Sequence, residues 1–448
     1  MNGDCRSLIA SAKRPAELKE AVAQVRAKLN SSKNSLKNCV TVLQYDPLLN
    51  GAIKFNVLTQ RIDIVRPLGW NRESSTLTDT DMKYLLLYLE EEYGIVNEKK
   101  IEHAVRIVAN ENRYHPIREY LSGLKWDGQE RIRYALAKFL GAPVDEYTHQ
   151  ALRLFMLGAI CRVFEPGCKF DVMLCLVGGQ GAGKSTFFRL LAVRDEWFTD
   201  DLRRLDDENV YRRLQGHWII EMSEMLATAN AKSIEEIKSF LSRQKETYKI
   251  PYETHPADRL RQCVFAGTTN RQDFLPRDRS GNRRFLPVSV DPDRAETHIL
   301  ADEAASRAYI QQMWAEAMGI YRSGNYSLML APELQKELLV YQQDFMQEDT
   351  IQGMIIAFLE DYPGDRVCSK LLWAEALNHP FEEPQDWQTR NICEIMNQGI
   401  LNGSISGWRA YKNGKRYKKY GTQKGWERIP DRDGFCDLPE QVEIPFKP

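Results

Sequence analysis

The sequence predicts a mostly helical N-terminal region, an α/β core with a phosphate-binding loop, and a C-terminal winged-helix-like domain. The core is predicted by a continuous apolar run, Val172–Val177, that leads directly into a glycine-rich loop. Two more short apolar runs follow, Trp218–Ile220 and Val264–Ala266, with helical patterns between them. Such alternation of strands and helices is typical of a parallel sheet covered by helices. The C-terminal domain is predicted by a basic, aromatic tail that follows helical segments.

The composition excludes membrane-spanning and secreted classes. The chain has 448 residues, of which 43% are hydrophobic and 27% charged, and its net charge is −1. The longest apolar runs, such as Phe155–Cys161, are far shorter than the roughly 20 residues that cross a bilayer. The N-terminus, Met1–Arg14, lacks the apolar centre of a signal peptide. Nine cysteines without a C-x-x-C pair, and histidines without ligand spacing, predict no transition-metal site.

Changes in pattern divide the chain into four segments. Leu18–Leu29 follows one helical face, and the short apolar runs Val40–Leu43 and Ile62–Val65 predict strands after it. Residues 98–164 have a mostly helical pattern. The expected segments are an N-terminal α+β region (1–110), a helical collar (111–170), the α/β core (171–346) and the winged-helix-like domain (347–448).

The strongest motif is a complete G-x-x-x-x-G-K-[ST] loop between an apolar strand and a helical stretch. Glycines let successive backbone N–H groups curl around phosphate, and the helix N-terminus adds partial positive charge. Lys184 then reaches the β- and γ-phosphates, and the Ser185 hydroxyl is a ligand for Mg²⁺. Since the guanine-binding pattern [NT]-K-x-D is absent, the sequence favours ATP over GTP. The loop consists of Gly178, Gly179, Gln180, Gly181, Ala182, Gly183, Lys184, Ser185 and Thr186.

Three later positions supply other groups that nucleotide hydrolysis needs. Glu221 and Glu224 end an apolar run, where one carboxylate holds the metal ion and the other activates water. We take Ser185 and Glu221 as the metal ligands, although the spacing alone does not assign the two glutamates. Asn270 follows the next apolar run, where its amide can hold the attacking water.

Two adjacent arginines, Arg283 and Arg284, follow on a loop that leads into another apolar strand. Arginine placed against the developing charge of a transferring phosphoryl group accelerates hydrolysis, often from a neighbouring subunit. The spacing does not choose between the two arginines, so both are candidates for this role.

These motifs, in this order, resemble the virulence-associated protein E family of helicase-like ATPases from phages and mobile elements. The resemblance extends over residues 45–345, roughly, and several unrelated short motifs recur in register within it. Its pieces are Tyr114-His-Pro-Ile-Arg-Glu-Tyr-Leu, Leu124-Lys-Trp-Asp-Gly, the phosphate-binding loop, Glu221-Met-Ser-Glu, Ile237-Lys-Ser-Phe-Leu, Gly267-Thr-Thr-Asn and Gly281-Asn-Arg-Arg-Phe.

The resemblance implies a core similar to superfamily 3 helicases within the AAA+ group, a hexameric ring and a role in replicating mobile DNA inside a bacterial cytoplasm. By this likeness Asn270 is the sensor, Arg283 or Arg284 the finger, and Lys238 a residue near the nucleotide or the central pore. Only about 110 residues precede the collar, so we expect no primase domain.

The tail Arg409–Arg428 adds an expectation of DNA binding. It contains eight basic residues against one acidic residue, with aromatic side chains between them. Basic groups neutralise phosphates and aromatic rings stack on bases. Asn413-Gly414 predicts the turn of a hairpin that would form the wing. The residues expected to contact single-stranded or forked DNA are Lys415, Arg416, Tyr417, Lys418, Lys419 and Trp426.

The sequence thus favours a ring-forming DNA helicase that uses ATP and Mg²⁺. Two alternatives stay open. A small-molecule kinase has the same loop, but it seldom needs paired glutamates, a sensor asparagine and a basic tail together. An ATP-switched regulator or defence protein that binds nucleic acid without unwinding it shares all of these motifs.

Overall fold

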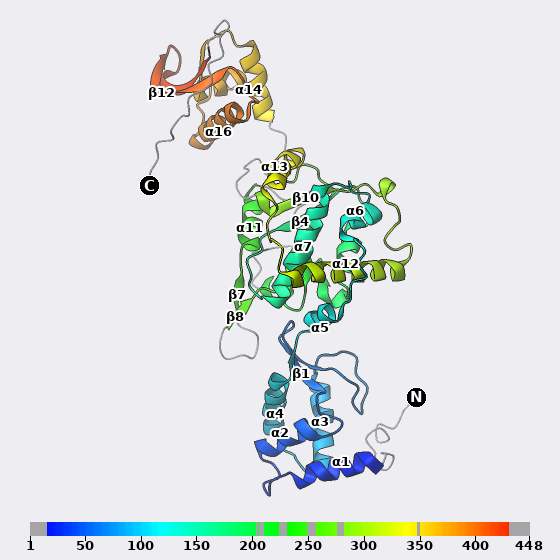
Figure 1. The fold of residues 1–448 in the computed structure, drawn as a ribbon. Helices are drawn as coiled ribbons and strands as arrows, with labels where there is room; N and C mark the ends of the chain where they lie inside the picture. Colours follow the sequence, from blue (N-terminus) through cyan, green and yellow to red (C-terminus); the bar gives the residue numbers. More distant parts are fainter. Residues whose placement is uncertain are drawn as a thin grey trace, which may run out of the picture. The chain divides into compact units, whose positions relative to one another are not determined.

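The computed structural model describes residues 16–202, 205, 210–223, 231–248, 257–275, 282–346 and 350–429. The chain forms two compact units that divide after residue 347, and Figure 1 shows their elements. Among the described helices, none has both the length and the apolar character that crossing a membrane requires.

The described N-terminal part of the first unit, residues 16–114, combines four helices with a small sheet. The sheet has the order β2-β1-β3, in which β1 pairs antiparallel with β2 and parallel with β3. The elements are α1 (Ala16–Ala27), α2 (Leu36–Tyr45), β1 (Ile53–Asn56), β2 (Arg61–Ile64), α3 (Asp79–Tyr93), α4 (Glu98–Glu111) and β3 (Arg113–Tyr114).

The strand expected at Val40–Leu43 is wrong, because these residues lie in the helix α2. The short apolar run suggested a strand, yet Cys39, Val42 and Leu43 also have the i, i+3, i+4 spacing of a helical face. All three are fully buried in the N-terminal core. The Ser35 side chain caps the helix by accepting from the Asn38 N–H, which favours the helical alternative.

The rest of the first unit is built around a five-stranded sheet. Its order is β10-β4-β9-β6-β5, and every adjacent pair is parallel. The strands are β4 (Met173–Val177), β5 (Phe198–Thr199), β6 (Ile219–Glu221), β9 (Val264–Thr269) and β10 (Phe285–Ser289), with a separate hairpin of β7 (Lys245–Tyr248) and β8 (Ala257–Leu260).

Helices cover both faces of this sheet (Figure 1). Alternation along β4 sends Leu174 and Leu176 into one core with α7 and α12, and Met173 and Cys175 into a second core with α11. The helices are α5 (Pro116–Gly123), α6 (Ile132–Leu140), α7 (Glu146–Phe164), α8 (Lys184–Leu191), α9 (Val210–Leu214), α11 (Ala231–Leu241), α12 (Glu303–Ser323) and α13 (Pro332–Tyr341). The 3₁₀ segments are η3 (Asp195–Trp197), η4 (Asn282–Arg284), η5 (Pro292–Arg294) and η6 (Gln342–Phe345).

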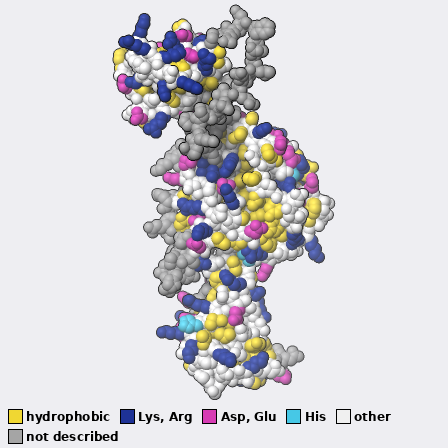
Figure 2. Space-filling view, turned by 60° about the vertical axis from the view of Figure 1, so that its left-hand side comes forward, with side chains coloured by type: hydrophobic (Ala, Val, Ile, Leu, Met, Phe, Trp, Pro, Cys, Tyr) yellow, Lys and Arg dark blue, Asp and Glu magenta, His cyan; other side chains and the backbone are white. Residues whose placement is uncertain are grey.

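The second unit has its own core, formed by helices against a three-stranded antiparallel sheet of order β11-β13-β12. Its elements are α14 (Thr350–Asp361), β11 (Arg366–Cys368), α15 (Ser369–Leu371), the π-helical turn η7 (Leu372–Ala376), α16 (Asp386–Asn402), β12 (Trp408–Tyr417) and β13 (Gly421–Arg428). Lys and Arg side chains are prominent on the face of this unit that Figure 2 shows.

The hairpin in the basic tail is present, but the turn expected at Asn413-Gly414 is wrong. These two residues lie inside β12, and the chain reverses at residues 418–420. Tyr411 pairs with Gly425 and Lys415 with Gln423, so β12 contains two more residues than β13 between these pairs. The Asn-Gly pair is absorbed in a β-bulge, another place where such residues are favoured.

Candidate functional site

The glycine-rich loop joins the end of β4 to the start of α8, so Lys184 is the first residue of the helix. Gly181 and Gly183 have φ values of +81° and +78°, which side chains rarely adopt. At Gly178 a Cβ atom would lie 2.3 Å from the carbonyl oxygen of Val290. The glycines are therefore required by backbone conformation and by close approach.

The strand order brings the other expected residues to the same edge of the sheet. β9 lies between β4 and β6, and all three strands are parallel. Their carboxyl ends therefore meet at one edge, where Gly178, Asn270 and Glu221 follow or end their strands. Ligands of open α/β sheets bind at this edge.

Lys184 is held inside the loop by three hydrogen bonds. Its Nζ donates to the carbonyl oxygens of Gly178 and Gly179 at 2.7 and 2.6 Å. It also donates to Asn270 Oδ1 at 3.0 Å. Burial lowers the pKa of the Lys184 ammonium group, while the nearby Glu221 opposes this shift. The lysine is thus directed into the loop with its three donors satisfied.

Glu221 forms the centre of a second group of contacts. Its Oε1 accepts from Ser185 Oγ at 2.7 Å and from the Thr268 hydroxyl. Its Oε2 is buried and has no hydrogen-bond partner among the described residues. Burial raises the pKa of the Glu221 carboxyl group, although the bonds from Thr268 and Ser185 act in the opposite direction. A hydroxyl and a carboxylate with a vacant oxygen suit a hard cation such as Mg²⁺.

A cavity of about 470 Å³ adjoins these groups. Residues 180–186 of the loop and residues 268–270 at the end of β9 line it, and Ser223, His298 and Leu300 complete its wall. The last three are functional candidates that sequence reasoning missed. His298 and Leu300 come from the segment between η5 and α12, which carries no motif, so only the tertiary fold places them here.

The other residues expected in the core lie elsewhere. Glu224 is outside the described residues. Arg283 and Arg284 precede β10, whose first residue pairs with the first residue of β4. The two arginines therefore lie near the amino ends of the strands, whereas the cavity of their own chain lies at the carboxyl ends. Lys238 is buried on α11, where its Nζ donates to Glu235 Oε1 at 2.6 Å, and it does not line the cavity.

The two arginines differ in their surroundings. The Nε atom of Arg284 donates to Asp171 Oδ2 and to Ser242 Oγ, both at 3.1 Å. Arg283 is exposed and has no hydrogen bond or ion pair with any described residue. Of the two arginines, Arg283 is thus the more exposed to solvent.

The basic residues expected to bind DNA lie together on the β12–β13 hairpin. Arg416, Lys418 and Lys419 are exposed. Lys415 is partly buried, forms an ion pair with Glu427 and lies 4.6 Å from the centre of the Tyr411 ring. Three of the four cations thus face solvent, whereas the charge of Lys415 is neutralised within the hairpin.

Trp426 faces the core of the second unit, which corrects the base stacking expected of this residue from the sequence. Trp426 is only 3% exposed, and its Nε1 donates to Asn397 Oδ1 at 2.9 Å. No face of this ring is open to a base, so Trp426 is a core residue. Tyr417 is half-buried and its hydroxyl is hydrogen bonded to that of Tyr411 at 2.6 Å.

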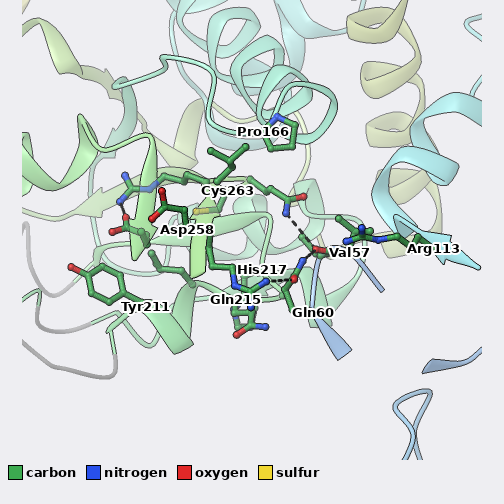
Figure 3. A pocket seen from close by; sticks show the side chains of 17 residues that line it. Val57, Gln60, Arg113, Pro166, Tyr211, Gln215, His217, Asp258 and Cys263 are labelled. Carbon is green, nitrogen blue, oxygen red and sulfur yellow. Dashed lines mark hydrogen bonds and ion pairs between the residues drawn. The ribbon is translucent and has the colours of Figure 1, made fainter. Parts of the chain in front are cut away.

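A second cavity of about 300 Å³ lies where the N-terminal part meets the core (Figure 3). Figure 3 shows Val57 and Arg113 across the cavity from Tyr211 and Asp258. Polar bonds cross this junction, including one from Arg259 to Gln60. His115 Nε2 also lies 2.7 Å from Gln262 Oε1. None of the functional residues expected from the sequence lines this cavity, and its contacts connect the two parts of the unit.

No curated protein matches the sequence. Two solved structures to which the chain is similar are described as apo structures of the NrS-1 C-terminal region. The A form is 12% identical with a TM-score of 0.45, and 83% of this chain and 95% of that chain are covered. The other is 14% identical with a TM-score of 0.42, and the coverage is 89% and 99%. The family model of the virulence-associated protein E-like domain matches residues 121–347, just over half of the sequence, and the chain therefore belongs to this family.

Proposed function

We propose that the chain is a DNA-dependent ATPase, a ring-forming helicase or replication ATPase of a phage or mobile genetic element. The supporting observation is the convergence of Lys184, Ser185 and Asn270 on one cavity, with Glu221 bonded to Ser185 behind it. The proposal includes an AAA+-type core and a winged-helix-like C-terminal domain.

In this mechanism the backbone N–H groups of the loop and the start of α8 bind the phosphates of ATP. Lys184 exchanges its bonds to the carbonyls of Gly178 and Gly179 for the β- and γ-phosphate oxygens. Ser185 and Glu221 would hold Mg²⁺, which neutralises charge on the β- and γ-phosphates. The vacant Oε2 of Glu221 fits this assignment.

Water then attacks the γ-phosphorus in line, and the bond to the β-phosphate oxygen breaks to give ADP and phosphate. Asn270 holds this water, because its amide lies at the cavity and beside the lysine. With Glu221 assigned to the metal ion, Glu224 is the candidate for the base that receives the proton of water.

The charge that develops on the γ-phosphate needs a further cation, which Arg283 of a neighbouring subunit supplies. Arg283 lies at the opposite edge of the sheet from the cavity of its own chain, it is exposed, and it has no ion pair among the described residues. The exposed Arg416, Lys418 and Lys419 bind the phosphates of DNA.

The first test is Lys184→Ala. Loss of the ammonium group should reduce ATP hydrolysis to background, since no other described lysine lines the cavity. The matched control is Lys83→Ala, an exposed lysine on α3, which should leave the rate unchanged. A well-folded Lys184→Ala protein with the parental ATPase rate would exclude the proposed site.

The second test separates a motor from an ATP-switched regulator. The wild-type protein should displace a strand from a forked duplex in the presence of ATP and Mg²⁺, and the Lys184→Ala protein should not. Forks of both polarities are used, because the site does not determine direction. ATPase activity that DNA stimulates, without displacement on either fork, would favour the regulator.

A further inference from the structure

We propose that Gln342 is a positioning residue for Arg283, the arginine that acts on the nucleotide of the neighbouring subunit. The inference rests on the proposed function, and it names the contact that fixes the backbone from which the Arg283 side chain projects. Gln342 belongs to no sequence motif, and it lies 59 residues after Arg283 in the chain.

Gln342 holds both ends of the turn that carries Arg283. It is the first residue of η6 and its side chain is 0% exposed. Its Nε2 donates to the carbonyl oxygen of Asn282 and to that of Phe285, each at 2.8 Å. These two residues stand immediately before and after the arginine pair. One buried amide therefore ties together the two ends of the turn η4.

Arg283 supplies no anchor of its own, so its position depends on the backbone of the turn, which the Gln342 amide helps to hold. Arg283 is exposed and unpaired among the described residues, so its position follows from the backbone that carries it. Arg284, by contrast, is fixed through its own side chain by Asp171 and Ser242. A buried carbonyl group that loses its hydrogen-bond donor is left unsatisfied at a cost in stability, so two carbonyls deprived of their donors favour a rearranged turn.

Gln342 is itself held in place on both sides. The hydroxyl of Tyr341 accepts from the Ser289 N–H at 3.2 Å, at the far end of β10. The carbonyl oxygen of Phe345 accepts from the Leu275 N–H at 2.9 Å, in the segment after β9. The short run from Tyr341 to Phe345 thus bridges two parts of the core, which leaves its amide little freedom to shift.

The test is Gln342→Met, which keeps the length of the side chain and removes both donors. We expect ATP hydrolysis to fall by about tenfold to a hundredfold, the range that a misplacement near 1 Å produces. ATP binding should stay at the parental level, because the cavity is lined by other residues. The matched control is Gln335→Met on α13, which removes a side-chain bond to the Leu330 carbonyl oxygen and should keep the parental rate.

Mixing experiments show on which side of the shared site Gln342 acts. Gln342→Met subunits mixed with Lys184→Ala subunits should regain activity, since each supplies the half that the other lacks. Gln342→Met mixed with Arg283→Ala should regain none, because both impair the same half. A structural defect of the whole subunit would not give this pattern.

Two outcomes overturn the inference. The first is a parental ATPase rate for Gln342→Met. The second is a Gln342→Met defect that mixing with Lys184→Ala subunits does not rescue, although the same mixing rescues Arg283→Ala. If Lys184→Ala subunits fail to rescue Arg283→Ala as well, the proposal of a site shared between subunits is wrong. This result distinguishes a failure of the proposed function from a failure of the role of Gln342. Should Gln342→Met not fold, Gln342→Asn takes its place. It keeps both donors on a shorter side chain, and a smaller loss with the same rescue pattern is expected.

Discussion

At the scale of single residues, Lys184 and Glu221 are both buried, and burial disfavours the charged form of each side chain. Burial lowers the pKa of the Lys184 ammonium group and raises the pKa of the Glu221 carboxyl group. Their hydrogen bonds compensate in part, through loop carbonyls for the lysine and through hydroxyls for the glutamate. In the proposed function, a phosphate chain would favour the charged form of Lys184 and a divalent cation that of Glu221.

We predict that Glu221→Gln still binds ATP but hydrolyses it about 10²-fold more slowly or worse, because the neutral amide holds Mg²⁺ less well and the charge stabilisation by a metal ion contributes several kcal/mol. The variant also tests the raised pKa. A carboxyl whose pKa is higher in the folded state stabilises the fold below its ordinary value of 4.5, and this stability is lost as the pH rises through the folded value. Glu221→Gln should lack this loss.

The measurement is the melting temperature without nucleotide from pH 4 to pH 8. The wild-type protein should lose more stability than Glu221→Gln across this range, so the difference between them should grow with pH in favour of the variant. Parallel curves would show that burial of the carboxyl is not the cause. Glu333→Gln, an exposed glutamate on α13, is the control.

At the scale of elements, the C-terminal hairpin separates charge from aromatic packing. One set of side chains, including Trp426, closes the core of the second unit, while Arg416, Lys418 and Lys419 project into solvent. The hairpin is therefore stabilised by its apolar face, and these three charges form no ion pair with any described residue. This arrangement suits contact with phosphates, whereas the buried ring of Trp426 is not available to stack on a base.

Replacing Arg416, Lys418 and Lys419 by alanine should flatten the plot of log K against log salt by about two to three units on duplex DNA. Lys415→Ala should change the slope little, because its charge is already paired with Glu427. Basal ATPase activity should not change, since these residues belong to the second compact unit and do not line the cavity.

The control for this triple variant removes an equal number of exposed cations from the N-terminal region, as Lys83, Lys99 and Arg106 to alanine. It should bind DNA with the parental slope. Equal slopes for both triple variants would mean that DNA contacts lie outside the hairpin, and the pore side of the core would then be the place to examine.

At the scale of the whole molecule, one chain contains both the cavity beside the glycine-rich loop and Arg283, but the length of the strands β4 and β10 separates them. β10 pairs with β4 from end to end, so Arg283 and the glycine-rich loop occupy opposite edges. In the proposed function a second chain would supply the arginine, and closure of such contacts around an axis would make a ring.

The ring predicts a mass of six chains of 51.8 kDa when Glu221→Gln, which retains ATP, is measured with ATP and Mg²⁺ by native mass spectrometry. Without nucleotide we expect smaller species, because the shared ligand is absent. Arg283→Ala should shift the distribution towards smaller species at equal concentration. A monomer under all conditions would contradict a site shared between chains.

Much of the core follows from the sequence because its signals are local. The apolar run before the glycine-rich loop predicts β4, and the loop motif predicts the start of α8, since glycine conformation and helix N-termini depend on neighbouring residues. Both agree with the structure within a few residues. Local signals failed where two patterns coincide: Val40–Leu43 fits a strand as well as a helix, and Asn413-Gly414 fits a bulge as well as a turn.

By itself, the sequence determined which residues are candidates for the site, because each belongs to a short motif with its own chemistry. These candidates are the glycine-rich loop, the two glutamates, the asparagine and the two arginines. Only the tertiary structure decided which of them meet. Strand order brings Glu221 to Ser185 across β9, and it separates Arg283 from the cavity of its own chain. Burial likewise makes Trp426 a core residue and makes Gln342 the anchor of a distant turn. Such contacts join residues far apart in the chain, and their energies depend on distance and burial, which residue types and spacing do not specify.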